Sequence, residues 1–427
     1  MLRIFLILSL LHDTCVSVPQ EPVDIFSEIS GSTLETAIAI FSQSVYVHMT
    51  QNSKSDNFAF SPLCLHSCLS MLYLGTTDGS RTERELGQAM GIINNKNLVK
   101  TLDSNVGRSY MKQKSLTFGS HGWMDKSLNV TESYRDLMMK VFGAGISQTD
   151  FSDSKSTDKI NKWISDLTNN KITKLVDSLS PSTKLFLANA VYFKEKWLEP
   201  FEDTDVLSGK KVEGEFETDT GKISVPMMFR TSSIIRYGEI KHKGIEFDVV
   251  AVPYENENFE MQFIIPKQIR DFYICEDLMM QEVMRDRQVG NVNDGFNLFS
   301  APKFGSSNFI DEVNLKIPKF KVNSKFDAAN ALKMMGVNKA FGSGAELDKF
   351  VSGGPIALGK VISEAFVEVT KNGTEATAAT GVELVLLSAS PGSVKNIIIN
   401  KPFIFIVQDT LNNIPLLAGR IKNPKSP

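Results

Sequence analysis

A run of almost unbroken apolar residues, "KLFLANAVYF" (residues 184–193), places the strongest constraint on how this chain can fold. A strand with one solvent-exposed face alternates apolar and polar residues, whereas a strand buried on both faces does not. The run therefore predicts a central strand in a sheet that is covered on both sides. Asn189 lies in its middle, and a buried amide without hydrogen bonds costs about 1–3 kcal/mol.

Helices are predicted mainly in the first half of the chain. Apolar residues spaced i, i+3, i+4, i+7 predict helices over 25–49, over 65–72 with an end at Gly75, and over 160–167. Ser80 and Glu83 have the spacing of a capping box for a further helix.

Strands are predicted mainly in the second half, where one more helix ends at Gly336. The predicted strands cover 57–61, 249–253, 259–265, 313–317, 361–370, 396–407 and 415–420. The sequence contains no repeat and no Pro/Gly/Ser linker, so it predicts a single domain. The order of the elements indicates a mixed α+β domain rather than repeated βαβ units.

The charge and the motifs exclude several function classes. A net charge of −3 argues against nucleic acid as the main partner. Small basic clusters at 108–114 and 194–196 are interpreted as solvated faces, with a polyanion site as the alternative. The glycine-rich stretch 354–360 lacks the hydroxyl residue of a phosphate loop, because Val361 follows it.

No enzyme constellation is present in the sequence. It contains no Gly-x-Ser-x-Gly elbow, no His-Glu-x-x-His pair and no paired Cys-x-x-Cys. We therefore expect no catalytic residue, no metal site and no cofactor. A hydrolase remains an alternative without motif support.

The N-terminus predicts secretion. Arg3, an apolar run over 4–11 and small residues near position 17 are typical of a signal peptide at 1–17, followed by an extension at 18–29. An N-terminal core helix is the alternative. No later segment predicts a membrane span. The two sequons, at Asn129 and Asn372, would then be available for glycosylation.

Cysteine usage does not predict a disulfide framework. Cleavage near residue 17 would remove Cys15 and leave three cysteines, an odd and sparse set. Cys64 and Cys68 lie four residues apart on an apolar helical stripe, where buried thiols are expected.

The segment 371–390, "KNGTEATAATGVELVLLSAS", alternates like a strand but is built from small residues. One parity, beginning at Thr374, is small or apolar, and the other carries Glu375 and Glu383. An edge strand or a flexible Ala/Thr linker explains this pattern. The sharper hypothesis is a segment that can become a strand but is not always one.

Several motifs together resemble the serpin family. They are "NFAFSPLCLHSCLSMLYLGT", "INKWISDLTNNKITKLV", "FLANAVYFKEKW", "VPMM", "VNLKIPKF", "GTEATAAT" and "IINKPFIFIV", in the order and spacing of that family. The resemblance covers residues 30–424 and implies a serpin domain over 30–427. It implies an α+β fold with a large central, mostly antiparallel sheet, two smaller sheets, eight or nine helices and an exposed reactive loop at 371–395.

The resemblance also implies a suicide-substrate inhibitor of serine proteases. In the family, a protease cleaves the loop and is acylated, and the loop then inserts into the main sheet and carries the protease away. The hinge of that movement corresponds to Gly373, Thr374, Glu375, Ala376, Thr377, Ala378, Ala379 and Thr380. Gly373 is the expected pivot, since only glycine takes unusual backbone angles freely.

Family spacing places the cleaved bond at Leu387–Ser388, to within one residue. No Arg or Lys lies between positions 372 and 394, so we expect a chymotrypsin-, elastase- or chymase-like target rather than a trypsin-like one. A cysteine protease is an alternative target. A non-inhibitory serpin that acts as carrier, storage protein or chaperone is the alternative function. We expect a monomer that forms a covalent complex with the protease.

Residues expected to control opening of the sheet partly match the family. Ser61, Asn189 and Trp197 match. Lys371 stands where inhibitory relatives usually carry Glu, Cys64 replaces a usual Ser, and Ser363 stands where many members have His. These departures leave the rate of loop insertion open.

Overall fold

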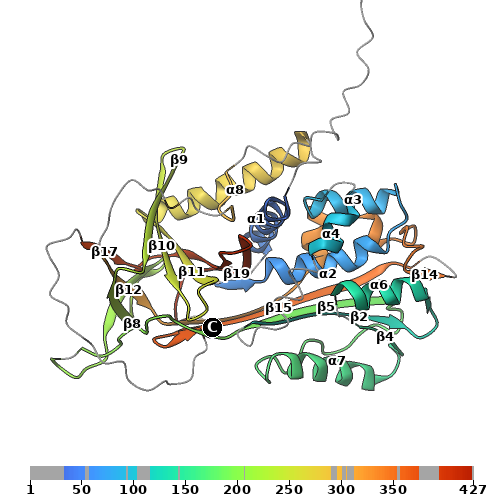
Figure 1. Ribbon diagram of the computed structural model, residues 1–427, viewed down its shortest axis with the longest axis horizontal. Helices are drawn as coiled ribbons and strands as arrows, with labels where there is room; N and C mark the ends of the chain where they lie inside the picture. The colour runs from blue at the N-terminus through green and yellow to red at the C-terminus, as the bar shows by residue number, and fades with distance from the viewer. Residues whose placement is uncertain are drawn as a thin grey trace, which may run out of the picture.

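The apolar run forms β5 (Leu185–Phe193), a central strand whose nine residues are all buried. In the computed structural model, the described residues are 33–52, 57–92, 95–102, 116–142, 145–205, 207–289, 296–300, 304, 312–352, 356–374 and 394–425. Helices lie above and below the sheet that contains β5, which is why both of its faces are apolar (Figure 1).

The large sheet has seven strands. Six follow the order β4 (Ile146–Thr149), β2 (Leu116–Asp125), β5, β15 (Leu358–Thr370), β16 (Gly373–Thr374) and β6 (Glu195–Lys196), and β13 (Phe320–Asp327) also pairs with β15. Two neighbouring pairs are parallel, β2 with β4 and β5 with β15, and the others are antiparallel. The predicted large, mostly antiparallel sheet is therefore confirmed.

Two smaller sheets pack beside it. The six-stranded sheet follows the order β1 (Phe58–Phe60), β19 (Ile414–Ile421), β18 (Phe403–Asp409), β11 (Phe259–Pro266), β10 (Ile245–Pro253) and β9 (Arg236–His242). The four-stranded sheet follows β17 (Val394–Ile398), β12 (Glu312–Pro318), β8 (Gly221–Ser232) and β7 (Glu213–Thr218). A short pair, β3 (Asn129–Val130) with β14 (Val351–Ser352), lies apart.

The predicted strand region 396–407 is divided between two of these sheets. It contains parts of β17 and β18, which belong to the four-stranded and the six-stranded sheet. Pro402 lies between them, and proline cannot donate to a strand ladder. The apolar pattern in this region correctly predicts strand structure, but it cannot show that the chain passes from one sheet to another.

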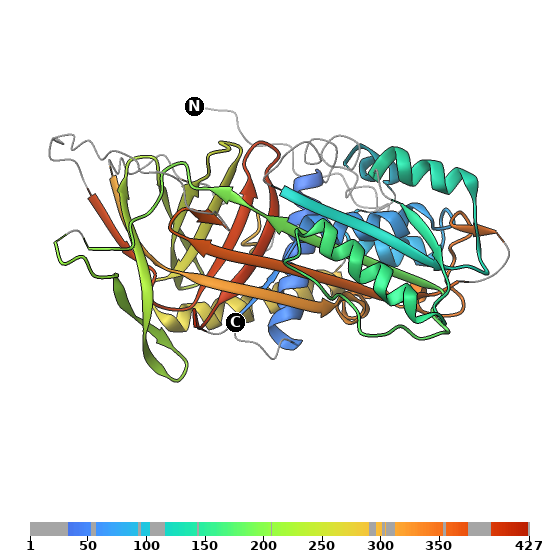
Figure 2. The ribbon, with the colours of Figure 1, turned by 90° about the horizontal axis from the view of Figure 1, so that it is seen from below.

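Eight α-helices lie within the described ranges, consistent with the expected eight or nine. They are α1 (Leu34–Asn52), α2 (Pro62–Leu74), α3 (Arg81–Ala89), α4 (Lys96–Leu102), α6 (Glu132–Phe142), α7 (Ser154–Leu167), α8 (Ile269–Val289) and α9 (Ala328–Met334). Helices α1 to α4 lie on one side of the large sheet and α7 crosses the other side (Figures 1 and 2). Among the described helices, none has the length and apolarity needed to cross a membrane.

Local signals explain where the early helices begin and end. Helix α2 is capped by the Ser61 hydroxyl, which accepts from the Cys64 N–H, and it stops at Gly75 as predicted. Helix α3 is capped by Ser80, which accepts from the Glu83 N–H at 3.1 Å. The reciprocal bond of a capping box differs, because the Glu83 carboxylate accepts from Gly79 and not from Ser80.

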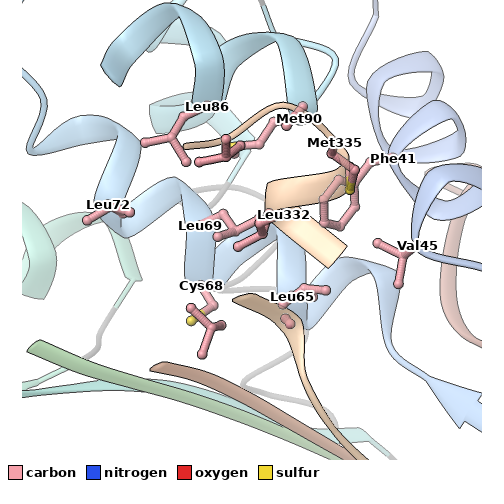
Figure 3. Packing of buried hydrophobic residues seen from close by; sticks show 14 of the residues in the cluster. Phe41, Val45, Leu65, Cys68, Leu69, Leu72, Leu86, Met90, Leu332 and Met335 are labelled. Atoms are coloured by element: carbon pink, nitrogen blue, oxygen red, sulfur yellow. The ribbon is translucent and has the colours of Figure 1, made fainter. Parts of the chain in front are cut away.

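All thirteen residues of α2 are buried, so this helix forms the centre of the core rather than its surface. Figure 3 shows Leu65, Leu69 and Leu72 of α2 packed among residues of α1, α3 and α9. Cys68, on the same helix, points toward the strands below. A second apolar cluster joins the large sheet to the smaller ones, and a third lies between β5, β15 and α7.

One carboxylate is buried on the face of the large sheet that α7 covers. Glu364 of β15 is 5% exposed and lies between Ile362 and Phe366, which face the same side. Burial raises the pKa of Glu364, and the positive charge of Lys325, its cross-strand neighbour, opposes that effect only in part. The ionised form of Glu364 is therefore unfavourable in this packed state.

We predict that Glu364→Gln raises the melting temperature at pH 7.5. Because the pKa of Glu364 is raised on folding, the native state binds its proton more readily, and wild-type stability increases as the pH falls toward the ordinary glutamate range. The gain, about 1 °C per kcal/mol for a domain of this size, should shrink at pH 5. Thermal unfolding at both pH values tests this, with the half-buried Glu368→Gln as control. An equal gain at both pH values would contradict the prediction.

Candidate functional site at the top of the large sheet

The first two hinge residues already occupy a strand position at one end of the large sheet. Gly373 and Thr374 form β16, which pairs with β15 on one side and with β6 on the other. We call this end the sheet top, defined by residues 195–203, Tyr254 and 370–374. The Thr374 side chain is fully buried there.

Gly373 is required at the sheet top for two physical reasons. Its φ is +146°, a backbone conformation that L side chains rarely adopt. A Cβ at this position would also lie 2.2 Å from the Glu195 carbonyl oxygen and 2.6 Å from the Lys196 Cα. The sequence predicts unusual backbone angles at Gly373, and the close approach of β6 is the further constraint that only the structure shows.

Two stacked aromatic rings contact the end of β15 and the start of β16. The Trp197 and Tyr254 rings lie 4.5 Å apart and nearly parallel. The Trp197 indole N–H donates to the Thr370 carbonyl at 2.9 Å, and the Tyr254 and Thr374 hydroxyls hydrogen-bond at 2.6 Å. These rings connect the end of β15 to the start of the hinge.

The turn that carries Lys371 is held by backbone and side-chain contacts. The Phe201 N–H donates to the Lys371 carbonyl at 2.8 Å, and the Trp197 N–H donates to the Asn372 carbonyl at 3.1 Å. The Lys371 ammonium lies 3.4 Å from Asp203 Oδ1. Lys371, which stands where inhibitory relatives usually carry Glu, thus has Asp203 as an anionic partner.

Below the sheet top, β5 and β15 pair directly with each other in parallel. Ser363 and Asn189 are partners in this register, and the Ser363 hydroxyl donates to Asn189 Oδ1 at 2.9 Å. The Asn189 amide nitrogen has no oxygen acceptor among the described residues, and its neighbour is the Cys68 thiol, a weak acceptor. The hydrogen bonding of Asn189 is therefore incomplete in this state.

The predicted sheet-opening residues separate into distinct groups. Trp197 and Lys371 lie at the sheet top, whereas Asn189 and Ser363 lie in the paired part below. Ser61 caps α2 and donates to the Leu416 carbonyl of β19. The thiol beside Asn189 belongs to Cys68, one helical turn after Cys64.

The three described cysteines are free and buried, as expected. Burial raises the pKa of the Cys64 and Cys68 thiols to about 12, so neither is poised as a nucleophile. Across the described ranges, no three histidine, cysteine or acidic side chains gather in a metal-binding arrangement.

Several predicted residues lie outside the described ranges. These are Glu375, Ala376, Thr377, Ala378, Ala379, Thr380, Leu387 and Ser388. Of the two sequons, Asn129 is exposed and Asn372 is half-buried in the turn before β16. The exposed asparagine is the more accessible of the two.

The sequence prediction does not include Tyr254, whose hydroxyl contacts Thr374, or Asp203, whose carboxylate contacts Lys371. Asp203 follows the matched "FLANAVYFKEKW" motif by six residues, so its proximity to Trp197 was available as a signal. Tyr254 follows the predicted strand 249–253 directly, but nothing in the sequence indicates that it meets Thr374, 120 positions away.

We predict that Gly373→Ala destabilises the sheet top. The substitution adds the cost of a sparsely populated positive-φ backbone, about 1–3 kcal/mol, and a clash with β6. Gly336→Ala is the matched control, because Gly336 also has a positive φ, +94°, but an added Cβ there meets nothing within 4 Å. Heat-induced polymerisation, followed on native gels, should be faster for Gly373→Ala than for Gly336→Ala. Equal rates would show that the space beside β6 is unimportant.

The comparison with known proteins agrees with this geometry. The family model "Serpin (serine protease inhibitor)" matches residues 36–424. Human neuroserpin is 27% identical over 415 residues, covering 94% of each chain. A serine protease inhibitor of Cyanea capillata is 28% identical and covers 86% of this chain and 92% of its own.

Solved structures show the same fold. Serpin48 of the insect Tenebrio molitor superposes with a TM-score of 0.74 at 24% identity, over 91% of this chain and 98% of its own. Human thyroxine-binding globulin, solved with its thyroid hormone bound, superposes with a TM-score of 0.72 at 22% identity, over 92% and 98%. The expected serpin fold is confirmed, and the chain belongs to the serpin family.

Proposed function

We propose that this protein is a secreted suicide-substrate inhibitor of chymotrypsin- or elastase-like serine proteases. The main support for the proposal is a strand that has only begun to form between β15 on one side and β5 with β6 on the other. Gly373 and Thr374 form its top, while below them β15 and β5 are bonded directly to each other. The new strand can continue if β15 and β5 separate.

The registers on both sides support this insertion. At the top, Thr374 pairs with Val369 of β15 on one side and with Glu195 of β6 on the other. Further down, Ile362 of β15 pairs directly with Ala188 of β5. The difference in residue number across the two strands is the same in both places. Interposing a longer strand therefore needs no slip of β15 along β5. A one-residue slip would turn every side chain to the wrong face.

Continuing the register of β16 assigns a position to each loop residue. Thr374 faces the buried side opposite Val369, so the alternate residues Ala376, Ala378 and Thr380 would face the same side. All are small. Glu375 would lie between Glu368 and Lys194, and Glu383 would lie opposite the exposed Lys360. The carboxylates thus fall on the other face.

Thr380 would enter between Ser363 and Asn189. This position breaks the bond between those two side chains, but the threonine hydroxyl can both donate and accept. It can offer the Asn189 amide nitrogen the oxygen acceptor that it lacks. Each further inserted residue adds backbone hydrogen bonds to two strands, so the uninserted form is proposed to be kinetically trapped.

The proposed reaction begins as an ordinary proteolysis. The serine oxygen of the protease bonds to the Leu387 carbonyl carbon, the Leu387–Ser388 peptide bond breaks, and the Ser388 amine leaves with a proton from the protease's histidine. Insertion of residues 375–386 then carries the acylated protease along the sheet before water can hydrolyse the ester. The inhibitor is consumed in a single turnover.

An SDS gel tests this function against its alternatives. A stable complex with chymotrypsin supports inhibition. Cleavage without a complex would support a non-inhibitory role, such as the binding of a small ligand, as in thyroxine-binding globulin. Ester hydrolysis by this chain alone would indicate an enzyme. Recovery of a secreted chain that starts near residue 18 and carries a glycan at Asn129 would support the proposed localisation.

We predict that Thr380→Arg abolishes trapping without preventing cleavage. The cation would have to enter the buried space between Ser363 and Asn189, where an unpaired charge is very unfavourable. Yield of the SDS-stable complex should fall by at least about tenfold, equivalent to about 1.4 kcal/mol. Glu375→Arg is the matched control, because its position faces the side that carries Glu368 and Lys194. Wild-type yield for Thr380→Arg would exclude insertion in this register.

We predict that Leu387→Arg changes the target and leaves trapping intact. An apolar pocket that holds leucine should reject arginine by about 10- to 200-fold, whereas a trypsin-like pocket accepts it. Rate constants with chymotrypsin and trypsin measure the change, and mass spectrometry should find a released fragment that begins at Ser388. Continued trapping of chymotrypsin with no gain toward trypsin would exclude Leu387 as the cleaved residue.

A further inference from the structure

One buried carboxylate, Asp203, lies where several strands meet at the sheet top. Its side chain is 5% exposed and has three ammonium partners. They are Lys211 at 3.0 Å, Lys319 at 2.5 Å and Lys371 at 3.4 Å. A further contact comes from the Thr204 hydroxyl, 3.2 Å from Oδ1.

The three lysines belong to different parts of the molecule. Lys319 lies between β12 and β13 and so connects the four-stranded sheet with the large one. Lys371 lies in the turn between β15 and β16. Lys211 belongs to the same hairpin as Asp203, since Thr204 bridges to Lys211 and the Val212 N–H donates to the Asp203 carbonyl.

The charge balance makes Asp203 hard to replace. Burial alone would raise the pKa of Asp203, but the ammonium groups of Lys319, Lys211 and Lys371 outweigh it and hold that pKa far below the usual range. The carboxylate is therefore charged at physiological pH. Without it, three cations would share one partly buried space with no counterion from this residue.

Asp203 also belongs to the segment that holds the hinge turn. Phe201, two residues earlier, donates its N–H to the Lys371 carbonyl. Lys371 is thus held twice by the same short segment, through its backbone by Phe201 and through its side chain by Asp203. Gly373 and Thr374 follow two and three residues later, between β15 and β6.

We propose that Asp203 is a positioning residue for loop insertion: through Lys371 it keeps Gly373 and Thr374 seated between β15 and β6, so that insertion extends a strand that has already started. This inference rests on the proposed inhibitory function. The first residues of a new strand gain few hydrogen bonds for the conformational entropy that they lose. If Gly373 and Thr374 are already in place, loop insertion does not have to meet this initial cost.

Asp203→Asn should release the seat. After the protease is acylated, either the loop inserts and traps the protease, or water hydrolyses the ester and releases it. Slower insertion favours hydrolysis, so more inhibitor is cleaved for each complex formed. We expect the moles of inhibitor consumed per mole of protease trapped to rise several-fold. Hydrogen exchange should also increase in the peptide that covers residues 370–374, and this readout needs no protease.

A double-mutant cycle separates this role from general stability. Lys371→Met alone should raise both readouts, and adding Asp203→Asn to it should have much less effect than Asp203→Asn has in wild type. Lys211→Met is the matched control, because Lys211 contacts the same carboxylate but not the hinge turn, and Asp203→Asn should keep its full effect in that background. If Asp203→Asn does not fold, the contrast between Lys371→Met and Lys211→Met tests the same link.

The outcomes distinguish the two hypotheses. A wild-type chain that forms no complex with any protease would remove the proposed function, while the exchange measurement would still report on the seat. Unchanged exchange over 370–374 in Asp203→Asn, or an effect of the same size in the Lys371→Met background, would overturn the role of Asp203. Increased exchange without a change in inhibitor consumption would also overturn it, since the seat would then be unimportant for insertion.

Discussion

The parallel pairing of β5 with β15 holds the two halves of the large sheet together, and the packing on both faces follows from it. It closes the large sheet in its middle, and it stops at the upper end, where β16 separates β15 from β6. The apolar layers above and below must therefore fit a sheet of this width. The pairing register also fixes which residues an inserted strand would meet on each side.

Polar groups in this closed sheet are incompletely satisfied. The Asn189 amide nitrogen lacks an oxygen acceptor, and one carboxylate oxygen of Glu364 has no hydrogen-bond partner among the described residues. Both lie on strands that insertion would separate. Buried polar groups without partners are unfavourable. Under the proposed function, loop insertion would change the surroundings of both groups.

The sheet top shows how a charge change can be accommodated locally. A lysine at position 371 would be unfavourable beside Lys319 alone, but Asp203 lies between the two ammonium groups. The turn is also held by two backbone hydrogen bonds and by the side chains of Trp197 and Tyr254. We infer that the departure at position 371 preserves the seating of the hinge by a different arrangement of charges.

Local periodicity in the sequence predicts the α+β class, the central strand and five of the eight described helices, because these features depend on residues that lie close together in the chain. Residues 185–193 of the apolar run are buried on both faces as predicted, and Gly75, Gly336 and Ser80 mark helix boundaries as predicted. The prediction did not include the helices α4, α6 and α8 or the strands β2, β8, β9 and β13. In α8, the residues Phe272, Cys275, Met279 and Val283 form a buried helical stripe. That signal was available but weak, since charged residues interrupt it.

The contacts that build the candidate site follow from tertiary packing, because they join residues far apart in the chain. Tyr254 meets Thr374, and Asp203 meets Lys319 and Lys371, through strand pairings that no local pattern encodes. Gly373 illustrates the division. Its lack of a side chain permits the positive φ, which the sequence can suggest, but the backbone of β6 within 3 Å of an added Cβ is a fact of packing.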